Sequence, residues 1–363
     1  MSPLHKLHEV GQSIWLDAIS RAWLDDGTLA RYIRDFEVTG LTSNPTLFEQ
    51  AIGKSDLYDA AMRHVRAQDQ SDEDLFFDLA LDDLKRAADL FRPVFDATAG
   101  VDGWVSLEVS PLLAADAAST IKMATRLHAL AQRPNLFIKI PGTREGITAI
   151  EESVFAGVPI NVTLLFSAEQ YLDAAGAYMR AIERRIAAGR QPDVASVASV
   201  FVSRWDVAVH DKLGAELRNR LGIAVAMQTY RAYRELLASP RWQKLAAAGA
   251  RTQRLLWGST GTKDPNARAT LYIEALAAPD TINTMPEKTL LAFADQGKVQ
   301  GMLPADGGDS AAVIAAYRRA GIDDAQLSER LQQEGVQAFI KSWHQLLQGI
   351  AGKRKQAARE GAR

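Results

Sequence analysis

Short β-rich runs alternate with longer segments of helical period along most of this chain, and this alternation limits the fold more than any other feature. The longer segments place apolar residues at i, i+3 and i+4, as amphipathic helices do. Strand followed by helix, repeated eight times, predicts an α/β fold, a single (β/α)8 TIM barrel. The eight candidate strands are residues 13–17, 37–41, 104–109, 136–140, 159–165, 194–202, 254–257 and 281–285.

The chain length of 363 residues fits one large barrel or two ordinary domains. An open doubly wound sheet would need a glycine fingerprint after the first strand, and residues 17–20 contain no glycine. The sequence also has no linker rich in Pro, Gly or Ser and no low-complexity block. We therefore expect one domain over residues 1–363, with its core at roughly residues 10–300.

One segment between the second and third strands exceeds what a minimal barrel needs. Residues 55–95 are long enough for two helices, and one apolar face would carry Tyr58, Ala61, Met62 and Val65. We expect a helical elaboration packed on the side of the barrel.

The chain also continues well beyond the eighth strand. Residues 286–308 predict a helix and a turn, and residues 310–352 predict C-terminal helices with a cap at Asp323 and Asp324. Residues 353–363 are rich in Lys, Arg and Ala, which predicts a flexible, solvated basic tail with no nucleic-acid role.

Composition narrows the classes of function. Apolar residues make up 47% and charged residues 24%, and the net charge of −2 offers no basic field for nucleic acid or an anionic membrane. Cysteine is absent and the six histidines are scattered, so we expect no disulfide, no thiolate nucleophile and no metal site. No signal peptide or membrane span is recognisable. These features predict a cytoplasmic enzyme, monomer or homodimer, whose partners are small molecules.

The fourth candidate strand contains a lysine where a charge is costly. Lys139 lies inside residues 136–140, a run otherwise fit for a strand buried on both faces. A lysine held among apolar walls is the usual nucleophile for Schiff-base chemistry on a carbonyl substrate. By itself, Lys139 slightly favours a structural lysine that pairs with a carboxylate or extends to water, and its neighbours reverse that preference.

Polar side chains follow most of the other candidate strands. In a parallel barrel the carboxyl ends of all strands meet at one rim, where catalytic groups gather. Each residue alone has a plainer interpretation, such as a helix cap at Asp17, a turn at Asn44 or a surface ion pair at Arg204. Their coincidence at one rim favours a site formed by Asp17, Asn44, Glu108, Lys139, Asn161, Thr163, Ser199, Phe201 and Arg204.

The loop after the seventh strand suggests an anion site. Residues 258–263 do not match a phosphate-binding loop, which needs lysine directly after a glycine. Barrels nevertheless often bind phosphate with the loops near strands seven and eight. Ser259, Lys263 and backbone N–H groups could hold an anion there, with Arg204 as a bidentate partner. A tight turn with a solvated lysine is the alternative.

Together these residues resemble the transaldolase family, in the longer subgroup also found fused to glucose-6-phosphate isomerase. The resemblance covers most of residues 10–300 and implies a class I aldolase-type barrel that needs no cofactor. It rests on the segments 41–45 (LTSNP), 106–109 (SLEV), 138–141 (IKIP), 161–167 (NVTLLFS), 199–204 (SVFVSR) and 257–263 (WGSTGTK).

The resemblance also implies a role for each residue. Lys139 would form the Schiff base, Asp17 would be the acid/base in C–C cleavage, and Glu108 with Thr163 would hold the water that moves protons. The remaining residues would contact the substrate: Asn44, Asn161 and Ser199 its hydroxyls or the covalent intermediate, and Arg204 its phosphate. Many transaldolases have a second arginine in the phosphate site, whereas this chain offers Ser259 and Lys263.

Transaldolases transfer a dihydroxyacetone unit between sugar phosphates in the pentose phosphate pathway, and that is the expected activity. The nearest alternative is a fructose-6-phosphate aldolase, in which glutamine tends to replace Glu108 and tyrosine Phe201. A glycosidase barrel would instead use Asp17 and Glu108 as its two carboxylates. A non-catalytic sugar-phosphate binder on the same barrel is the third alternative.

Overall fold

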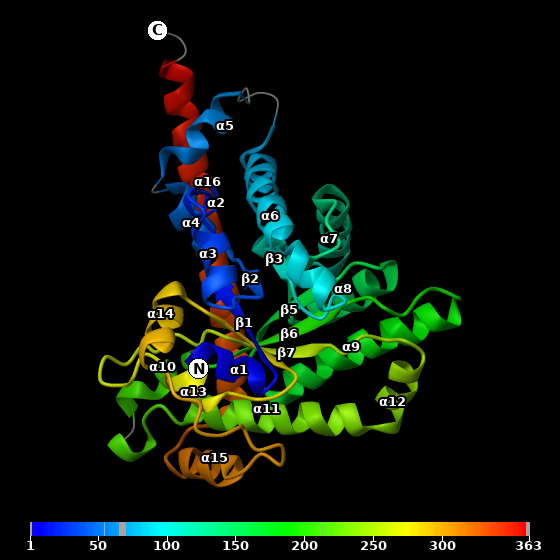
Figure 1. Ribbon diagram of the computed structural model, residues 1–363, viewed down its shortest axis with the longest axis vertical. Helices are drawn as coiled ribbons and strands as arrows, with labels where there is room; N and C mark the ends of the chain where they lie inside the picture. The colour runs from blue at the N-terminus through cyan, green and yellow to red at the C-terminus, as the bar shows by residue number, and fades with distance from the viewer. Residues whose placement is uncertain (1, 54, 65–69, 213, 361–363) are drawn as a thin grey trace.

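The computed structural model describes residues 2–53, 55–64, 70–212 and 214–360. Within them, parallel strands form a closed barrel in which each strand pairs with its neighbours in chain order and β8 closes on β1 (Figure 1). This confirms the predicted (β/α)8 barrel. The strands are β1 Gln12–Asp17, β2 Gly40–Thr42, β3 Trp104–Glu108, β4 Leu136–Pro141, β5 Ile160–Leu165, β6 Ser196–Phe201, β7 Arg254–Gly258 and β8 Thr281–Met285.

Seven strands lie within two residues of their predicted bounds, and β2 is the exception. The prediction of residues 37–41 was too early, because the chain is still turning after α3 at that point. Glu37 has a positive φ of 55°, and the Val38 N–H donates to the carbonyl of Tyr32 at 3.2 Å. Gly40 then begins β2 where a Cβ would lie only 2.6 Å from the ring of Trp15.

Helices connect and surround the strands. Most of them cover the outside of the barrel, as the pattern between the strands predicted (Figure 1). They are α1 Pro3–Glu9, α2 Arg21–Asp25, α3 Thr28–Asp35, α4 Pro45–Gly53, α5 Asp59–His64, α6 Asp72–Ala97, α7 Ala117–Ala131, α8 Arg144–Ala156, α9 Ala168–Ala187, α10 Ser203–Val209, α11 Leu221–Ala238, α12 Pro240–Ala247, α13 Leu271–Ala275, α14 Glu287–Gln296, α15 Ser310–Arg319 and α16 Asp324–Glu360. Short 3-10 turns are η1 Asp56–Tyr58, η2 Pro111–Leu113, η3 His210–Lys212 and η4 Ala215–Leu217.

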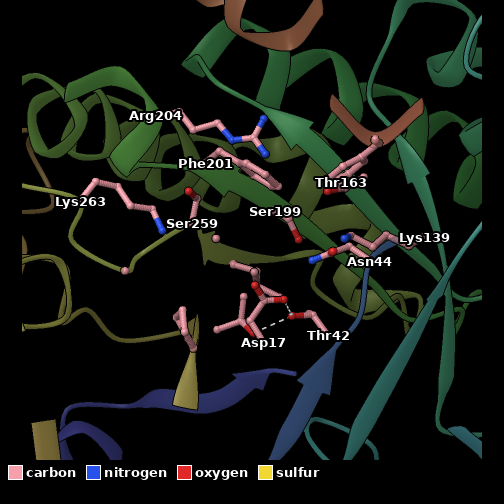
Figure 2. A pocket seen from close by; sticks show the side chains of 16 residues that line it. Asp17, Thr42, Asn44, Lys139, Thr163, Ser199, Phe201, Arg204, Ser259 and Lys263 are labelled. Atoms are coloured by element: carbon pink, nitrogen blue, oxygen red, sulfur yellow. Dashed lines mark hydrogen bonds between the residues drawn. The ribbon is translucent and has the colours of Figure 1, made fainter. Parts of the chain in front are cut away.

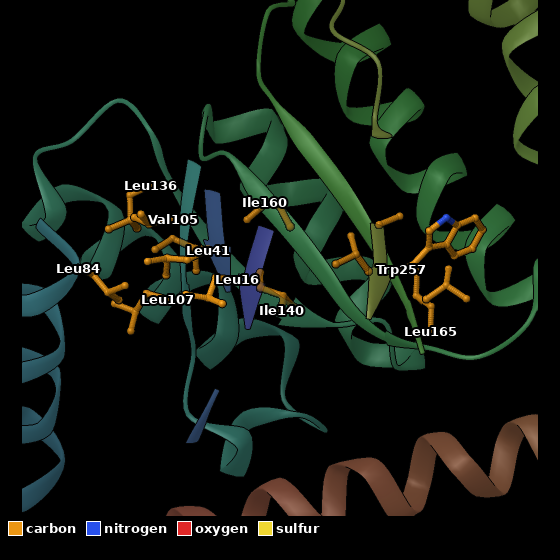
Figure 3. Packing of buried hydrophobic residues seen from close by; sticks show 14 of the residues in the cluster. Leu16, Leu41, Leu84, Val105, Leu107, Leu136, Ile140, Ile160, Leu165 and Trp257 are labelled. Atoms are coloured by element: carbon orange, nitrogen blue, oxygen red, sulfur yellow. The ribbon is translucent and has the colours of Figure 1, made fainter. Parts of the chain in front are cut away.

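The alternation of side chains along each strand divides the barrel into an outer and an inner layer. Outward residues form the main core against the helices, and Leu84 of α6 packs beside Val105 and Leu107 of β3 (Figure 3). Inward residues near the start of the strands form a separate apolar cluster that includes Trp104 and Phe137. Inward residues near the carboxyl ends are polar, so the same alternation that builds the core aims the polar groups at one rim.

The predicted elaboration between β2 and β3 is present as α5 and α6, preceded by α4. Tyr58 and Met62 are buried and Ala61 is partly buried, as their spacing predicted. Val65, the fourth residue of that predicted face, lies outside the described residues. The side chain of Asp323 accepts from the backbone N–H of Gln326 at 3.0 Å, so the predicted cap of the last helix is also present.

The predicted flexible basic tail is wrong for residues 353–360, which continue α16. Lys353 Nζ donates to Asp59 Oδ1 at 2.8 Å, and Arg354, only 7% exposed, donates through Nη1 to Asp72 Oδ1 at 2.6 Å. The first turns of α5 and α6 supply these carboxylates. The basic residues therefore dock the end of α16 on the elaboration.

Candidate active site

A small cavity of about 120 Å³ lies at the carboxyl ends of the strands (Figure 2). It brings together most of the residues that the sequence pointed to, although they come from six different segments of the chain. The predicted site residues that line it are Asp17, Asn44, Lys139, Thr163, Ser199, Phe201, Arg204, Ser259 and Lys263. Glu108 and Asn161, the other two predicted site residues, lie immediately behind this lining.

Lys139 faces the cavity from β4. The sequence suggested a lysine held among apolar walls, but polar groups also contact it. Its Nζ lies 3.0 Å from Oε2 of Glu108 and donates to the backbone carbonyl of Ser43 at 3.1 Å. Both side chains of the ion pair are 5% exposed. Glu108 and Lys139 are register partners on β3 and β4, and both point inward. The parallel pairing therefore places a proton acceptor beside the lysine.

Burial is the dominant influence on the Glu108 carboxyl and raises its pKa, while Lys139 opposes that shift. A carboxyl with a raised pKa beside an amine can exchange a proton with it more readily than an ordinary glutamate. The ion pair is itself costly to desolvate, and removing one partner would leave the other charge buried and unpaired. This pair is therefore suited to proton transfer more than to stabilising the fold.

Asp17 ends β1 and lines the same cavity as Lys139 (Figure 2). Burial raises the pKa of this carboxyl, with opposing contributions from Lys139 and from a hydrogen bond. That bond comes from Thr42 Oγ1, which donates to Asp17 Oδ1 at 2.8 Å and also lies 2.8 Å from the hydroxyl of Thr284. The arrangement fixes one carboxylate oxygen and gives Asp17 the character of an acid/base group.

A chain of hydrogen bonds links the inward residues of β3, β5 and β6. Asn161 Nδ2 donates to Ser106 Oγ at 3.1 Å, and Ser199 Oγ donates to Asn161 Oδ1 at 2.7 Å. Asn161 is fully buried and does not line the cavity. The structure thus brings Ser199 to the cavity directly, whereas Asn161 lies behind it and orients the serine hydroxyl.

Thr163 lies on an irregular part of β5. The pairing of β5 with β6 shifts register between Val162 and Leu165, and Leu164 has a positive φ of 58°. The Thr163 hydroxyl is buried, lines the cavity, and has no hydrogen-bond partner among the described residues. Buried hydroxyls usually have a partner. Thr163 is therefore available to a reacting group or a water molecule.

Asn44 contributes to both local structure and the cavity. Its Oδ1 accepts from the backbone N–H of Leu47 at 3.1 Å, which caps the start of α4, whereas the plainer interpretation of Asn44 was a turn. Its side chain also lines the cavity near Lys139 (Figure 2). The cap holds the amide in a fixed orientation, with its nitrogen left for a ligand.

Cationic groups gather at the other end of the cavity. Arg204, at the start of α10, and Lys263, on the loop after β7, both line it with Ser259 (Figure 2). Ser259 has a positive φ of 53°, and its hydroxyl lies 2.9 Å from that of Ser203. Burial lowers the pKa of the Arg204 guanidinium, opposed by Glu108, Glu334 and Asp17. Two cations and a hydroxyl at one end are suited to an anion.

Sequence reasoning missed the contributions of α16. Phe339 lines the cavity, although it lies about two hundred residues from Lys139 in the chain. No local signal in the sequence showed that this helix would cross the rim. Thr42 and Ser43 were also given no role, although both lie in the segment that carried the resemblance.

Two further searches of the described residues bear on function. They contain no group of three or more His, Cys, Asp or Glu side chains arranged to hold a metal ion. No helix within them is both long and apolar enough to cross a membrane.

A barrel with a buried lysine at the end of β4, beside a carboxylate, is the arrangement of a class I aldolase. The family model described as Transaldolase/Fructose-6-phosphate aldolase matches residues 14–350. A protein named transaldolase from Frankia alni is 45% identical over 359 residues, which cover 96% of this chain and 97% of the relative.

Other relatives give the same result. A transaldolase of Thermobifida fusca is 44% identical over 359 residues, covering 96% of this chain and 98% of the relative. A transaldolase of Thiobacillus denitrificans is 41% identical over 349 residues, covering 94% of this chain and 97% of the relative. This chain belongs to the transaldolase/fructose-6-phosphate aldolase family, which confirms the expected family.

Proposed function

We propose that this chain is a transaldolase that transfers a dihydroxyacetone unit between sugar phosphates through a Schiff base on Lys139. Sedoheptulose 7-phosphate and glyceraldehyde 3-phosphate would give erythrose 4-phosphate and fructose 6-phosphate, a reaction of the non-oxidative pentose phosphate pathway. The single observation that carries the proposal is the contact of Lys139 Nζ with Glu108 at 3.0 Å, at a cavity that Asp17 also lines.

The first stage forms the covalent intermediate. Lys139 gives a proton to Glu108, and the neutral amine attacks C2 of the ketose. The carbinolamine then loses water, with protons carried between Glu108, Thr163 and a water molecule between them. The product is an iminium ion, which draws electrons away from C3. The raised pKa of Glu108 supports its role as the group that takes the first proton.

The second stage breaks and remakes a C–C bond. Asp17 takes the proton of the C4 hydroxyl, the C3–C4 bond breaks, and its electron pair neutralises the iminium to an enamine as the aldehyde leaves. An acceptor aldehyde then binds, the enamine attacks its carbonyl carbon, and Asp17 returns the proton to the new hydroxyl. Hydrolysis of the iminium releases the product ketose and restores Lys139, so atoms and electrons balance without a cofactor.

The remaining lining residues would bind the substrate. Arg204, Lys263 and Ser259 would hold the phosphate through charge-assisted hydrogen bonds. Asn44 and Ser199 would contact sugar hydroxyls, with Asn161 holding the Ser199 hydroxyl in place. Phe201 would shield the enamine from water.

Borohydride trapping tests the covalent step. Reduction in the presence of fructose 6-phosphate should add the dihydroxyacetone unit to the peptide that contains Lys139, as read by peptide mass mapping. Lys122, on the outer helix α7, provides the matched control. Lys139→Met should abolish labelling, whereas Lys122→Met should not change it. A label on another lysine, or no label with an active preparation, would contradict the mechanism.

The family also includes fructose-6-phosphate aldolases, which release the three-carbon unit instead of transferring it. Glu108 and Phe201 favour the transferase, because neither an ionised glutamate nor a ring without a hydroxyl can itself donate a proton to the enamine. Incubation with fructose 6-phosphate alone, followed by addition of erythrose 4-phosphate, measures both outcomes. Release of free dihydroxyacetone as fast as sedoheptulose 7-phosphate forms would instead make the chain an aldolase.

A further inference from the structure

Helix α16 lies across the rim of the barrel, fixed to the ends of two catalytic strands. The side-chain amide of Gln332 donates to the backbone carbonyls of Gly142 and Leu164, each at 3.0 Å. Gly142 directly follows β4, which carries Lys139, and Leu164 lies on β5 next to Thr163. These two bonds set the position of the helix relative to the lysine.

Phe339 lies two helical turns beyond Gln332 and is 5% exposed. Its ring centroid lies 5.6 Å from Nζ of Lys139 and 5.9 Å from the guanidinium carbon of Arg204. The ring of Phe201 approaches the same guanidinium carbon at 5.0 Å. Gly335 completes the surroundings, because a Cβ on this residue would lie 3.1 Å from Nη1 of Arg204.

The way in which Arg204 is held distinguishes it from most arginines of this chain. Among the described residues it forms no ion pair and no hydrogen bond, although many other arginines are paired with carboxylates. Two aromatic rings lie close to it instead. Aromatic faces attract cations without using their N–H groups. The donors of Arg204 are therefore left for a ligand, while the rings restrict the position of the guanidinium.

We propose that Phe339 is a positioning residue that, together with Phe201, holds the guanidinium of Arg204 ready for the substrate phosphate and so sets the preference for phosphorylated donors. The inference rests on the proposed function and extends it to α16. Leucine or methionine could fill the same volume, but neither has the aromatic face that attracts a cation. Gly335 contributes by leaving room for the guanidinium beneath the helix.

The first experiment compares donors in Phe339→Leu, with Phe339→Tyr as the conservative variant. Phe339→Leu should raise KM for fructose 6-phosphate about three- to tenfold, the range expected from loss of one cation–π contact, and change kcat by less than about twofold. KM for unphosphorylated fructose should not change, and Phe339→Tyr should behave like the wild type. An equal loss on both donors would overturn the inference and leave Phe339 as a packing residue.

A double-mutant cycle with Arg204→Ala identifies the partner through which Phe339 acts. If Phe339 works by placing Arg204, the double variant should have the same KM for fructose 6-phosphate as Arg204→Ala alone. Additive effects would contradict the proposal. Trp343→Phe is the matched control on the same helix, because Trp343 packs on other rings away from the cavity. Its ring centroid lies 5.0 Å from that of Phe76 and 5.6 Å from that of Phe77. This control should leave the KM ratio of the two donors unchanged.

Binding of inorganic phosphate separates this inference from the proposed function. Calorimetry without turnover should show a Kd about three- to tenfold higher in Phe339→Leu than in the wild type. If the wild type lacked transaldolase activity but this difference remained, the proposed function would fail while the role of Phe339 held. If the wild type were active and the two Kd values were equal, only the inference would fail.

Discussion

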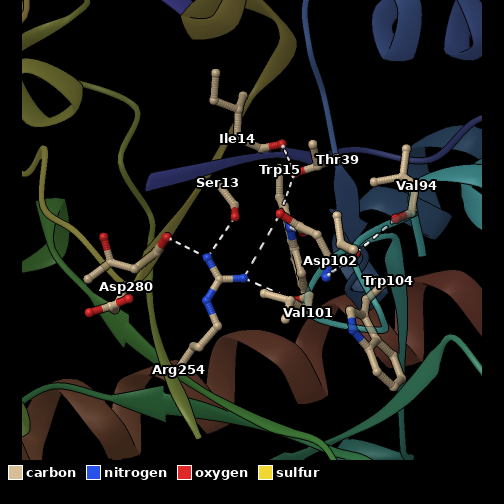
Figure 4. A network of polar contacts seen from close by, with 12 residues as sticks. Ser13, Ile14, Trp15, Thr39, Val94, Val101, Asp102, Trp104, Arg254 and Asp280 are labelled. Atoms are coloured by element: carbon tan, nitrogen blue, oxygen red, sulfur yellow. Dashed lines mark hydrogen bonds and ion pairs between the residues drawn. The ribbon is translucent and has the colours of Figure 1, made fainter. Parts of the chain in front are cut away.

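The two ends of the barrel interior are built from the same strands, but the polar groups at the two ends differ in how they are paired. At the amino-terminal end, Asp102 accepts from Trp15 Nε1 at 2.6 Å and from Thr39 Oγ1 at 2.9 Å, and it lies 3.9 Å from Nη1 of Arg254 (Figure 4). Arg254 Nη2 also donates to Ser13 Oγ at 2.6 Å. The polar groups of this network satisfy one another.

Aromatic rings also pack at the amino-terminal end, where the rings of Trp104 and Phe137 stack with centroids 4.0 Å apart. At the carboxyl end, in contrast, Asp17 and Glu108 have pKa values raised by burial, and the hydroxyl of Thr163 has no partner among the described residues. The network around Asp102 is satisfied within itself and stabilises the barrel. The carboxyl end instead keeps two buried carboxyls and a hydroxyl whose hydrogen bonds and charges a substrate can complete, and these groups lower the stability of the free protein.

The largest expected difference between the ends concerns Lys139. Lys139→Met should lower kcat by about 10⁴- to 10⁶-fold, as loss of a nucleophile does elsewhere. The variant should also be less stable in urea unfolding, because Glu108 loses its buried partner. Adding Glu108→Gln should restore stability without restoring activity. Recovery of activity in the double variant would remove Lys139 from the covalent step.

Asp17 comes next in expected effect. Asp17→Asn should slow C–C cleavage by about 10²- to 10⁴-fold, because the C4 hydroxyl loses its general base. Formation of the imine on Lys139 should continue, since that step precedes cleavage. Rapid-quench assays that separate trapped imine from released aldehyde measure both steps. Cleavage at the wild-type rate would leave Asp17 as a structural residue.

The amino-terminal end should show the opposite behaviour. Asp102→Asn should lower the free energy of unfolding by about 1.5–3 kcal/mol, the usual cost of losing a hydrogen bond to a charged group, and leave kcat unchanged. Asp96→Asn is the matched control, since Asp96 is 57% exposed and, within the part of the chain that the structure describes, its side chain pairs with Arg92 alone. A large loss of kcat in Asp102→Asn, with stability unchanged, would contradict the contrast between the two ends.

The smallest expected effect is on pH dependence. Asp17 and Glu108 must be ionised to accept protons. The apparent pKa of the acid limb of kcat/KM should therefore lie above 4.5, the ordinary pKa of glutamate. When burial gives a carboxyl a higher pKa in the folded protein than in the unfolded chain, the proton that it holds stabilises the fold at a pH below both values. This stabilisation is lost as the pH rises through the pKa of the folded protein. Asp17→Asn should therefore gain stability relative to the wild type at neutral pH and lose that gain in acid. A gain that persists unchanged in acid would contradict the raised pKa.

The sequence by itself determined the order of the strands and the direction of their side chains. Both follow from local rules: apolar runs of strand length, and alternation with a period of two. Once Lys139 was placed inside a buried strand, the register of parallel strands carried Asp17, Asn44, Thr163 and Ser199 to the same rim. These residues could be predicted because each lies within a few positions of a strand end.

Only the tertiary structure decided which groups touch. Three features depend on contacts between separate segments of the chain. They are the ion pair of Lys139 with Glu108, the position of Asn161 behind Ser199, and the path of α16, which brings Phe339 to the rim. The docking of Lys353 on Asp59 is of the same kind. A helical period shows that one face of α16 is apolar but not what that face covers, because the partner is chosen by the packing of the whole barrel.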